Sequence, residues 1–156
     1  SLGECTEAGL KIAAPILLVT GAGGAFGAVL AATPLGDYLG SSLSALGLGV
    51  FVPFLIAAAL KSAQGSSTVA LVAGSALIAP LLPQLGLDSD MGRVLCVMAI
   101  GAGAMTVSHV NDSYFWVVSQ FSRMDVATAV RAHTAATLIM GLVTISAVWL
   151  VSLVQL

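Results

Sequence analysis

The chain has 156 residues, of which 58% are hydrophobic and only 8% charged, and its formal net charge is −2. Soluble domains carry about a quarter charged residues, so this composition excludes an ordinary soluble protein, and the lack of a basic patch excludes a nucleic-acid-binding surface. We therefore expect an all-α integral membrane protein. Its apolar segments recur at lengths suited to a hydrocarbon core of about 30 Å, and they are continuous rather than alternating with a period of two, which favours helices over strands.

Enzymatic and metal chemistry are not indicated. Cys5 and Cys96 lie far apart, so they form neither a metal motif nor a disulfide framework, and we expect no metal or cofactor. Ser67 and His109 could be imagined as a nucleophile and a base, but no G-x-S-x-G motif surrounds the serine. The chain opens at Ser1 without a methionine or a basic signal-peptide region. We expect a non-enzymatic single membrane domain, residues 1–156, that is a fragment or a processed chain.

The first apolar segment runs from about Leu10 to Thr33, and four glycines stand among residues 20–27. Each glycine costs a helix interior about 1 kcal/mol relative to alanine. We take Gly21, Gly23 and Gly24 as a candidate helix break, while close packing of small residues against a neighbouring helix is the alternative. A polar turn, residues 34–44, follows.

Two short apolar stretches come next, residues 45–60 and 69–82, joined by the sequence K-S-A-Q-G-S-S-T. Each stretch is at or below the length of a comfortable membrane crossing. Two interpretations fit: two short spanning helices, or one re-entrant hairpin that enters the membrane and returns. Pro80 and Pro83 then lead into a polar connection, residues 84–92.

The segment from Arg93 to about Ser119 is apolar at both ends and contains I-G-A-G-A-M-T-V-S-H-V-N-D-S in its middle. A charged connection, residues 120–133, and an unbroken final helix, residues 134–156, complete about five hydrophobic segments. Cytoplasmic flanks are enriched in Lys and Arg. On this scheme Arg93 lies on one side of the membrane, and the other basic residues lie on the side predicted to be cytoplasmic: Lys11, Lys61, Arg123 and Arg131.

Asp112 is the only acid well inside an apolar segment. An ionisable group at membrane depth costs about 2.5–3.5 kcal/mol and usually lines a cavity or pathway. His109 and Asp112 share a helical face if the segment is helical there, and Gly101 and Gly103 would allow the backbone to unwind. Hydrogen bonds between helices are the alternative role for these polar groups, and a metal site lacks further ligands.

A second polar cluster, residues 64–68, lies between the two short stretches. A Ser or Thr there could cap a helix beginning near Val69, and the exposed N–H groups of that helix would favour an anion such as a carboxylate. A simple helix–helix turn without a ligand is the alternative. Lys61 could add a positive charge, or it could extend toward the membrane surface. Two interrupted elements with polar clusters indicate the midplane site of a secondary transporter.

Three stretches resemble the C-terminal part of the gluconate permease (GntP) family of proton symporters: L-L-V-T-G-A-G-G-A-F-G (17–27), A-A-A-L-K-S-A-Q-G-S-S-T-V-A-L (57–71) and S-H-V-N-D-S-Y-F-W (108–116). The resemblance implies the ion transporter superfamily fold, in which each of two inverted repeats supplies a re-entrant hairpin and a broken helix. Family members are about three times longer, so the chain would be about one repeat. The resemblance implies that a missing N-terminal repeat completes the site in a bacterial inner membrane, and we expect a homodimer partner as a further partner.

By this resemblance, a small organic anion such as gluconate or a related hydroxy acid is transported together with a proton. We predict that the substrate is bound by residues of both polar clusters: Gln64, Gly65, Ser66, Ser67, Thr68, Ser108, Asn111 and Ser113. We predict that the proton is carried by His109 or Asp112, since a buried acid and a histidine can both titrate near neutral pH. Another solute, such as a D-amino acid, and a packing subunit that transports nothing are the alternative functions.

Overall fold

The computed structural model describes residues 2–33, 38, 42, 45 and 47–155. Every regular element in these residues is helical, as predicted. The elements are α1 (Leu2–Ala31), α3 (Phe51–Gln64), α4 (Ser67–Ile78), the 3₁₀ turn η1 (Ala79–Leu81), α5 (Asp90–Met105), α6 (Ser113–Phe121), α7 (Val126–Ala129), the π-helical turn η2 (Val130–Thr134) and α8 (Ala135–Gln155).

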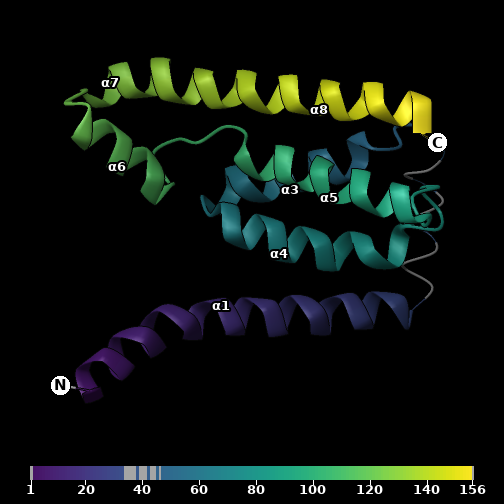
Figure 1. Ribbon diagram of the computed structural model, residues 1–156, viewed down its shortest axis with the longest axis horizontal. Helices are drawn as coiled ribbons and strands as arrows, with labels where there is room; N and C mark the ends of the chain where they lie inside the picture. Colours follow the sequence, from purple (N-terminus) through teal and green to yellow (C-terminus); the bar gives the residue numbers. More distant parts are fainter. Residues whose placement is uncertain (1, 34–37, 39–41, 43–44, 46, 156) are drawn as a thin grey trace.

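Helices α1, α3, α4, α5 and α8 lie nearly parallel or antiparallel in one stack, and the short helix α6 is inclined to them (Figure 1). Helices α3, α4 and α5 contact one another in the centre, with α8 against α5 on one side and α1 against α4 on the other. Small side chains and a glycine allow the three central helices to approach closely, a packing mode common in membrane bundles. The buried small residues at this centre include Ala57, Ala70, Gly74, Ala99 and Ala102.

Helices α3 and α4 form a tight hairpin. Gly65 ends α3 in the left-handed conformation, with φ of +80°, and its N–H donates to the Lys61 carbonyl. Ser66 then caps α4, because its hydroxyl accepts from the Val69 N–H at 3.3 Å. With 14 and 12 residues, the two helices are about 21 and 18 Å long at 1.5 Å per residue, shorter than a membrane core.

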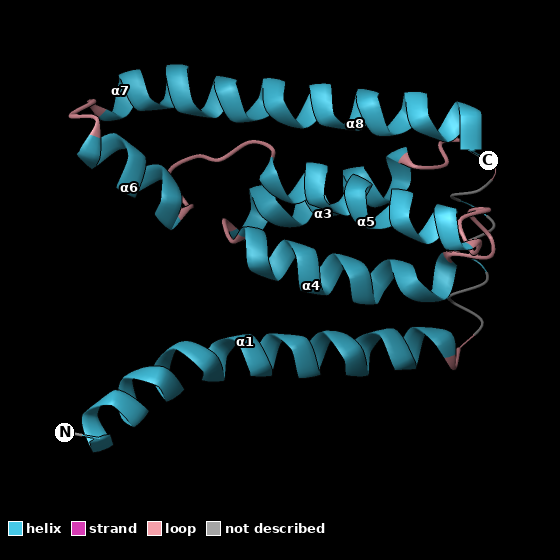
Figure 2. Cartoon of the chain, in the orientation of Figure 1, coloured by secondary structure: helices cyan, strands magenta, loops and turns pink. Residues whose placement is uncertain are grey.

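Helices α5 and α6 are separated by a linker, residues 106–112, which Figure 2 draws as a loop between them. Gly101 and Gly103 lie within α5, and the helix ends two residues beyond them at Met105, so the break is a little later than expected. Gly103 is needed for packing, since a Cβ there would overlap the Phe54 carbonyl of α3. The turn itself occurs at Val107, whose φ of +50° is strained for a β-branched residue.

The helix break expected at Gly21, Gly23 and Gly24 was wrong. Helix α1 continues through all three residues and begins at Leu2, earlier than the predicted start. A glycine weakens a helix but keeps its N–H, so the hydrogen-bond ladder can continue where apolar neighbours favour it. The alternative of close packing is also not seen at Gly21, because a Cβ there would meet no described atom within 4 Å.

The C-terminal helix is longer than predicted. The helical run Val126–Val154 has 29 residues and is the one helix among the described residues that is long and apolar enough to cross a membrane. The predicted connection, residues 120–133, was therefore too long. Asp125 caps this run by accepting from the Thr128 N–H at 2.9 Å, and the hydrogen bonds from Thr128 lower the pKa of this exposed carboxyl.

The positions of the basic residues along the stack can be compared with the predicted orientation. The first half of α1 and the turn between α6 and α7 lie at one end of the stack, and α5 begins at the other (Figure 1). This arrangement separates Lys11, Arg123 and Arg131 from Arg93, as the orientation scheme requires. Lys61 is buried in the last turn of α3, and its predicted position on the cytoplasmic side stays a prediction.

Candidate functional site

The tip of the α3–α4 hairpin lies against the linker between α5 and α6. A Cβ on Gly65 would overlap the backbone carbonyl of Asn111, so the two main chains are in direct contact. Two linker side chains bond to the same carbonyl near the tip: Nδ2 of Asn111 donates to the Ser62 oxygen at 2.9 Å, and Nε2 of His109 lies 3.2 Å from that oxygen. These contacts join the two polar clusters that the sequence singled out.

A buried ion pair lies at this junction. Nζ of Lys61 is 2.5 Å from Oδ2 of Asp112, and the two side chains are only 2% and 7% exposed. The ammonium also donates to the Gly65 carbonyl at 2.9 Å. Bringing two charges out of water is costly unless they are paired and hydrogen-bonded, so the arrangement fixes the hairpin tip against the linker through opposite charges.

Asp112 has two further partners. Its Oδ2 accepts from the Ser108 hydroxyl at 2.5 Å, and its Oδ1 accepts from the Tyr114 N–H at 3.0 Å. The second bond makes Asp112 the N-cap of α6. One carboxylate therefore starts a helix, neutralises a lysine and orients a serine.

Helix α8 and the π-helical turn η2 hold the linker from the other side. The Ser108 N–H donates to Oγ1 of Thr137 at 3.0 Å, and Oγ1 of Thr134 donates to the Ser108 carbonyl at 2.6 Å. Nε2 of His133 lies 3.1 Å from the Ser108 hydroxyl oxygen. Because this hydroxyl gives its only hydrogen to Asp112, it can accept but not donate here, so we assign the hydrogen of the second bond to His133 Nε2.

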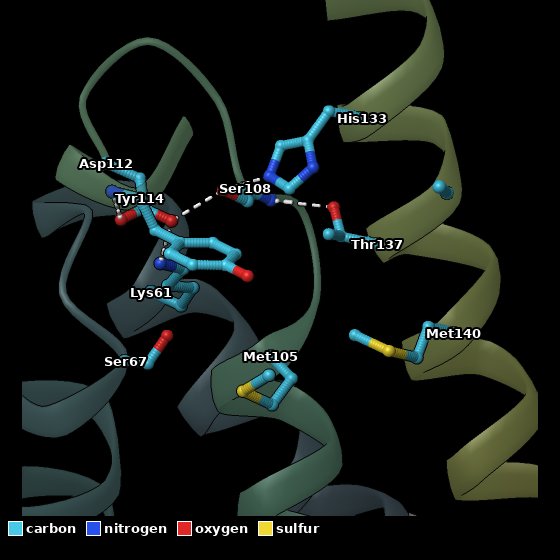
Figure 3. A pocket seen from close by; sticks show the side chains of 10 residues that line it. Lys61, Ser67, Met105, Ser108, Asp112, Tyr114, His133, Thr137 and Met140 are labelled. Atoms are coloured by element: carbon cyan, nitrogen blue, oxygen red, sulfur yellow. Dashed lines mark hydrogen bonds and ion pairs between the residues drawn. The ribbon is translucent and has the colours of Figure 1, made fainter. Parts of the chain in front are cut away.

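A pocket of about 310 Å³ opens between these groups. Figure 3 shows its side chains converging from the hairpin, the linker, α6 and the C-terminal helix. Its lining combines a cation, an anion, hydroxyl groups, a histidine and apolar side chains: Lys61, Ser67, Met105, Ser108, Asp112, Tyr114, His133, Ala136, Thr137 and Met140. Such a pocket can hold a small polar solute, with the ammonium positioned for a carboxylate.

Only one of the hairpin residues predicted to bind substrate lines the pocket. Ser67 lines the pocket, whereas Ser66 caps α4 and Gly65 contacts Asn111. The side chains of Gln64 and Thr68 are exposed and do not line the pocket.

Some of the residues predicted at the linker line the pocket and others lie outside it. Ser108 and Asp112 line the pocket, but Asn111 and Ser113 are exposed outside it. His109 bonds to Ser62 and is likewise absent from the lining.

Six pocket residues were not singled out from the sequence, and three of them are polar: Tyr114, His133 and Thr137. His133, Thr137 and Met140 are spaced four and three residues apart, which places them on one face of a helix, and this spacing was a usable signal. The π-helical turn that contains His133 is a further indication of function, since such turns occur often at functional sites. No sequence pattern brings Tyr114 into the pocket, because its position depends on the path of the linker.

Residues 1–154 match the family described as GntP family permease. The chain belongs to this permease family. The chain is 37% identical over 150 residues, 96% of its length, to the D-serine transporter DsdX of Escherichia coli K12, of which this covers 33%. It is 36% identical over 142 residues, 90% of its length, to a gluconate permease of Pseudomonas aeruginosa, of which this covers 31%.

A gluconate permease of Bacillus subtilis is 34% identical over 140 residues, with 89% of this chain and 30% of the permease covered. The chain thus spans about a third of the length of the curated relatives that it matches. No solved structure matches the chain. Family membership confirms the resemblance to the gluconate permease family that was drawn from the three sequence motifs.

Proposed function

We propose that this chain supplies part of the substrate site of a permease that carries a small organic anion together with a proton. The observation that supports this most directly is the pocket between the hairpin tip and the linker, where the buried Lys61–Asp112 pair meets several hydroxyl groups. A site for solute in the middle of a membrane needs charge and hydrogen-bonding groups that are shielded from lipid. Lys61 supplies a cation suited to a carboxylate.

The named substrates of the relatives agree with this chemistry. Gluconate and D-serine, the solutes in those names, are both small acids that carry a carboxylate and a hydroxyl group. Lys61 would bind the carboxylate, and Ser67, Ser108 and Thr137 would bind hydroxyl groups. We favour a sugar acid or related hydroxy acid, with a D-amino acid as the second candidate.

We further propose that α3 and α4 form a re-entrant hairpin and that α5, the linker and α6 form one broken spanning segment. Both hairpin helices are shorter than a membrane core, and the buried ion pair lies at the tip rather than at a wetted surface. A single cysteine at Ser67, in a protein lacking Cys5 and Cys96, should react with membrane-impermeant thiol reagents, and substrate should protect it. Reaction that substrate does not alter would contradict a hairpin tip at the substrate site.

The remaining part of the longer permease would complete the pocket. An inverted N-terminal repeat would supply a second hairpin and broken helix, and a homodimer would stabilise the assembly in a bacterial inner membrane. A packing subunit that transports nothing is the alternative, but packing alone does not require a lysine and an aspartate buried beside a pocket.

Uptake by the full-length permease in proteoliposomes tests the proposal. Labelled gluconate and labelled D-serine are supplied with and without an imposed inward proton gradient. We expect accumulation of one acid that collapses when the gradient is dissipated. A well-folded full-length protein that accumulates neither acid would contradict the proposed function, and accumulation that ignores the proton gradient would contradict proton coupling.

A further inference from the structure

Lys61 is already occupied by the protein's own carboxylate. Its ammonium group has three N–H donors, and two of them are accounted for by Asp112 Oδ2 and the Gly65 carbonyl. An incoming carboxylate that approached Lys61 would therefore meet Asp112 at the same nitrogen atom. Two carboxylates that share one cation in a poorly solvated pocket repel each other strongly.

We infer that Lys61 is the carboxylate anchor of this pocket and that Asp112 competes with the transported carboxylate for it, so that anion binding requires Asp112 to take up a proton. The inference rests on the proposed function and gives it a mechanism for coupling. One anion and one proton enter together, so the pocket keeps the same net charge. The neutral Asp112 side chain no longer needs the lysine, which is then free to bind the substrate.

The hydrogen-bonded chain from His133 provides a route for that proton. His133 Nε2 and Ser108 Oγ are 3.1 Å apart, and Ser108 Oγ and Asp112 Oδ2 are 2.5 Å apart. The Ser108 hydrogen can pass to Asp112 while His133 gives its own Nε2 hydrogen to Ser108. The serine is unchanged by this relay, protonated His133 becomes neutral, and Asp112 becomes a neutral acid.

Among the described residues that line the pocket, two other titratable groups face this chain of hydrogen bonds. Lys61 approaches from α3, and Tyr114 approaches from α6 with its ring 5.9 Å from that of His133. On the elements that carry His133, Arg131 is exposed and does not line the pocket. Among the residues that line the pocket, Asp112 supplies the carboxyl group and His133 the imidazole group of this relay.

Binding measured against pH tests the competition. The full-length permease is titrated with gluconate and with D-serine at about pH 5.5 and about pH 8, on either side of the histidine range. If Asp112 takes up one proton when the anion binds, the affinity for the acid should fall as the pH rises. Above the pH range in which that proton is bound, the fall should be up to about tenfold for each pH unit. In Asp112→Asn, Lys61 has no competing charge, so binding should be tight and independent of pH, while accumulation driven by the proton gradient is lost.

Asparagine can also cap a helix, so Asp112→Asn should keep the start of α6. Asp125→Asn is the matched control, because Asp125 is an exposed aspartate that caps a helix and lies outside the pocket. It should retain the wild-type pH dependence. Loss of binding in Asp112→Asn while Asp125→Asn binds normally would overturn the inference, since Asp112 would then be needed for binding rather than competing with it.

The double variant Lys61→Met with Asp112→Asn tests the role of Lys61 without leaving an unpaired charge buried in the protein. It should fold and should bind the acid about a hundredfold more weakly than wild type, or worse, if Lys61 is the anchor. Wild-type affinity in this variant would overturn the inference and the role proposed for Lys61, whereas proton-driven uptake by the wild-type permease would still support the proposed transport. Failure of the wild-type permease itself to bind or transport any acid would overturn both.

Discussion

The backbone of Gly65, at the tip of the α3–α4 hairpin, lies directly against the main-chain carbonyl of Asn111 in the linker between α5 and α6. Gly65 has a φ of +80°, which side chains disfavour, and a Cβ there would overlap that carbonyl. One glycine therefore permits both the tight hairpin turn and the contact that brings Lys61 to Asp112.

Gly65→Ala should destabilise the protein and reduce uptake together. The unfavourable backbone conformation costs about 1–3 kcal/mol. The new methyl group would also overlap the Asn111 carbonyl, so the hairpin tip would have to move away from the linker. Thermal unfolding and initial uptake rates of the full-length permease measure the two effects. Gly101→Ala is the control, since Gly101 is helical and a Cβ there meets no described atom within 4 Å. That change should be neutral or stabilising by about 1 kcal/mol, and an equal loss in both variants would contradict the special role of Gly65.

Lys61→Met alone should be more destabilising than removal of both charges. The single change leaves Asp112 buried without its cation, which typically costs about 3–5 kcal/mol. The double variant Lys61→Met with Asp112→Asn should recover much of this loss, because no isolated charge remains. Thermal unfolding compares the two, with Lys11→Met at an exposed lysine as the control. A double variant less stable than the single one would show that the pair contributes more than mutual neutralisation.

Thr137→Val should loosen the linker. Oγ1 of Thr137 accepts from the buried Ser108 N–H, and a buried donor left without its partner costs about 1–3 kcal/mol. We expect faster amide hydrogen exchange in residues 106–112 and a weaker apparent substrate affinity. Thr144→Val is the matched control, since Thr144 bonds to the Met140 carbonyl of its own helix. Unchanged exchange in Thr137→Val would mean that Ser108 is held by other contacts.

The two histidines of the chain should differ in their effect on proton coupling. His133→Gln should flatten the pH dependence of uptake, because His133 is hydrogen-bonded to Ser108 beside the pocket. His109→Gln should retain the pH dependence, because His109 instead contacts the Ser62 carbonyl outside the pocket lining. Uptake measured over a range of pH in matched proteoliposomes distinguishes them. The reverse result would favour His109, one of the two residues, with Asp112, predicted from the sequence to carry the proton.

The sequence alone was sufficient for the helical class, the membrane environment, the family and the two polar clusters. These depend on composition, on the length of apolar runs and on local motifs such as K-S-A-Q-G-S-S-T, all of which can be read without knowing how distant segments meet. The incorrect prediction also concerned a local pattern. The glycines of α1 were interpreted as a helix break, but glycine keeps its N–H group and α1 continues through them.

Long-range packing decides which residues line the pocket. Lys61 and Asp112 are 51 positions apart, and Ser108 and His133 are 25 apart. They meet because the hairpin tip, the linker and the C-terminal helix converge, and side chains on one short segment can point in different directions once the backbone leaves the helix. The linker therefore directs Ser108 and Asp112 into the pocket while His109 and Asn111 bond to the hairpin backbone, a division that helical spacing could not predict.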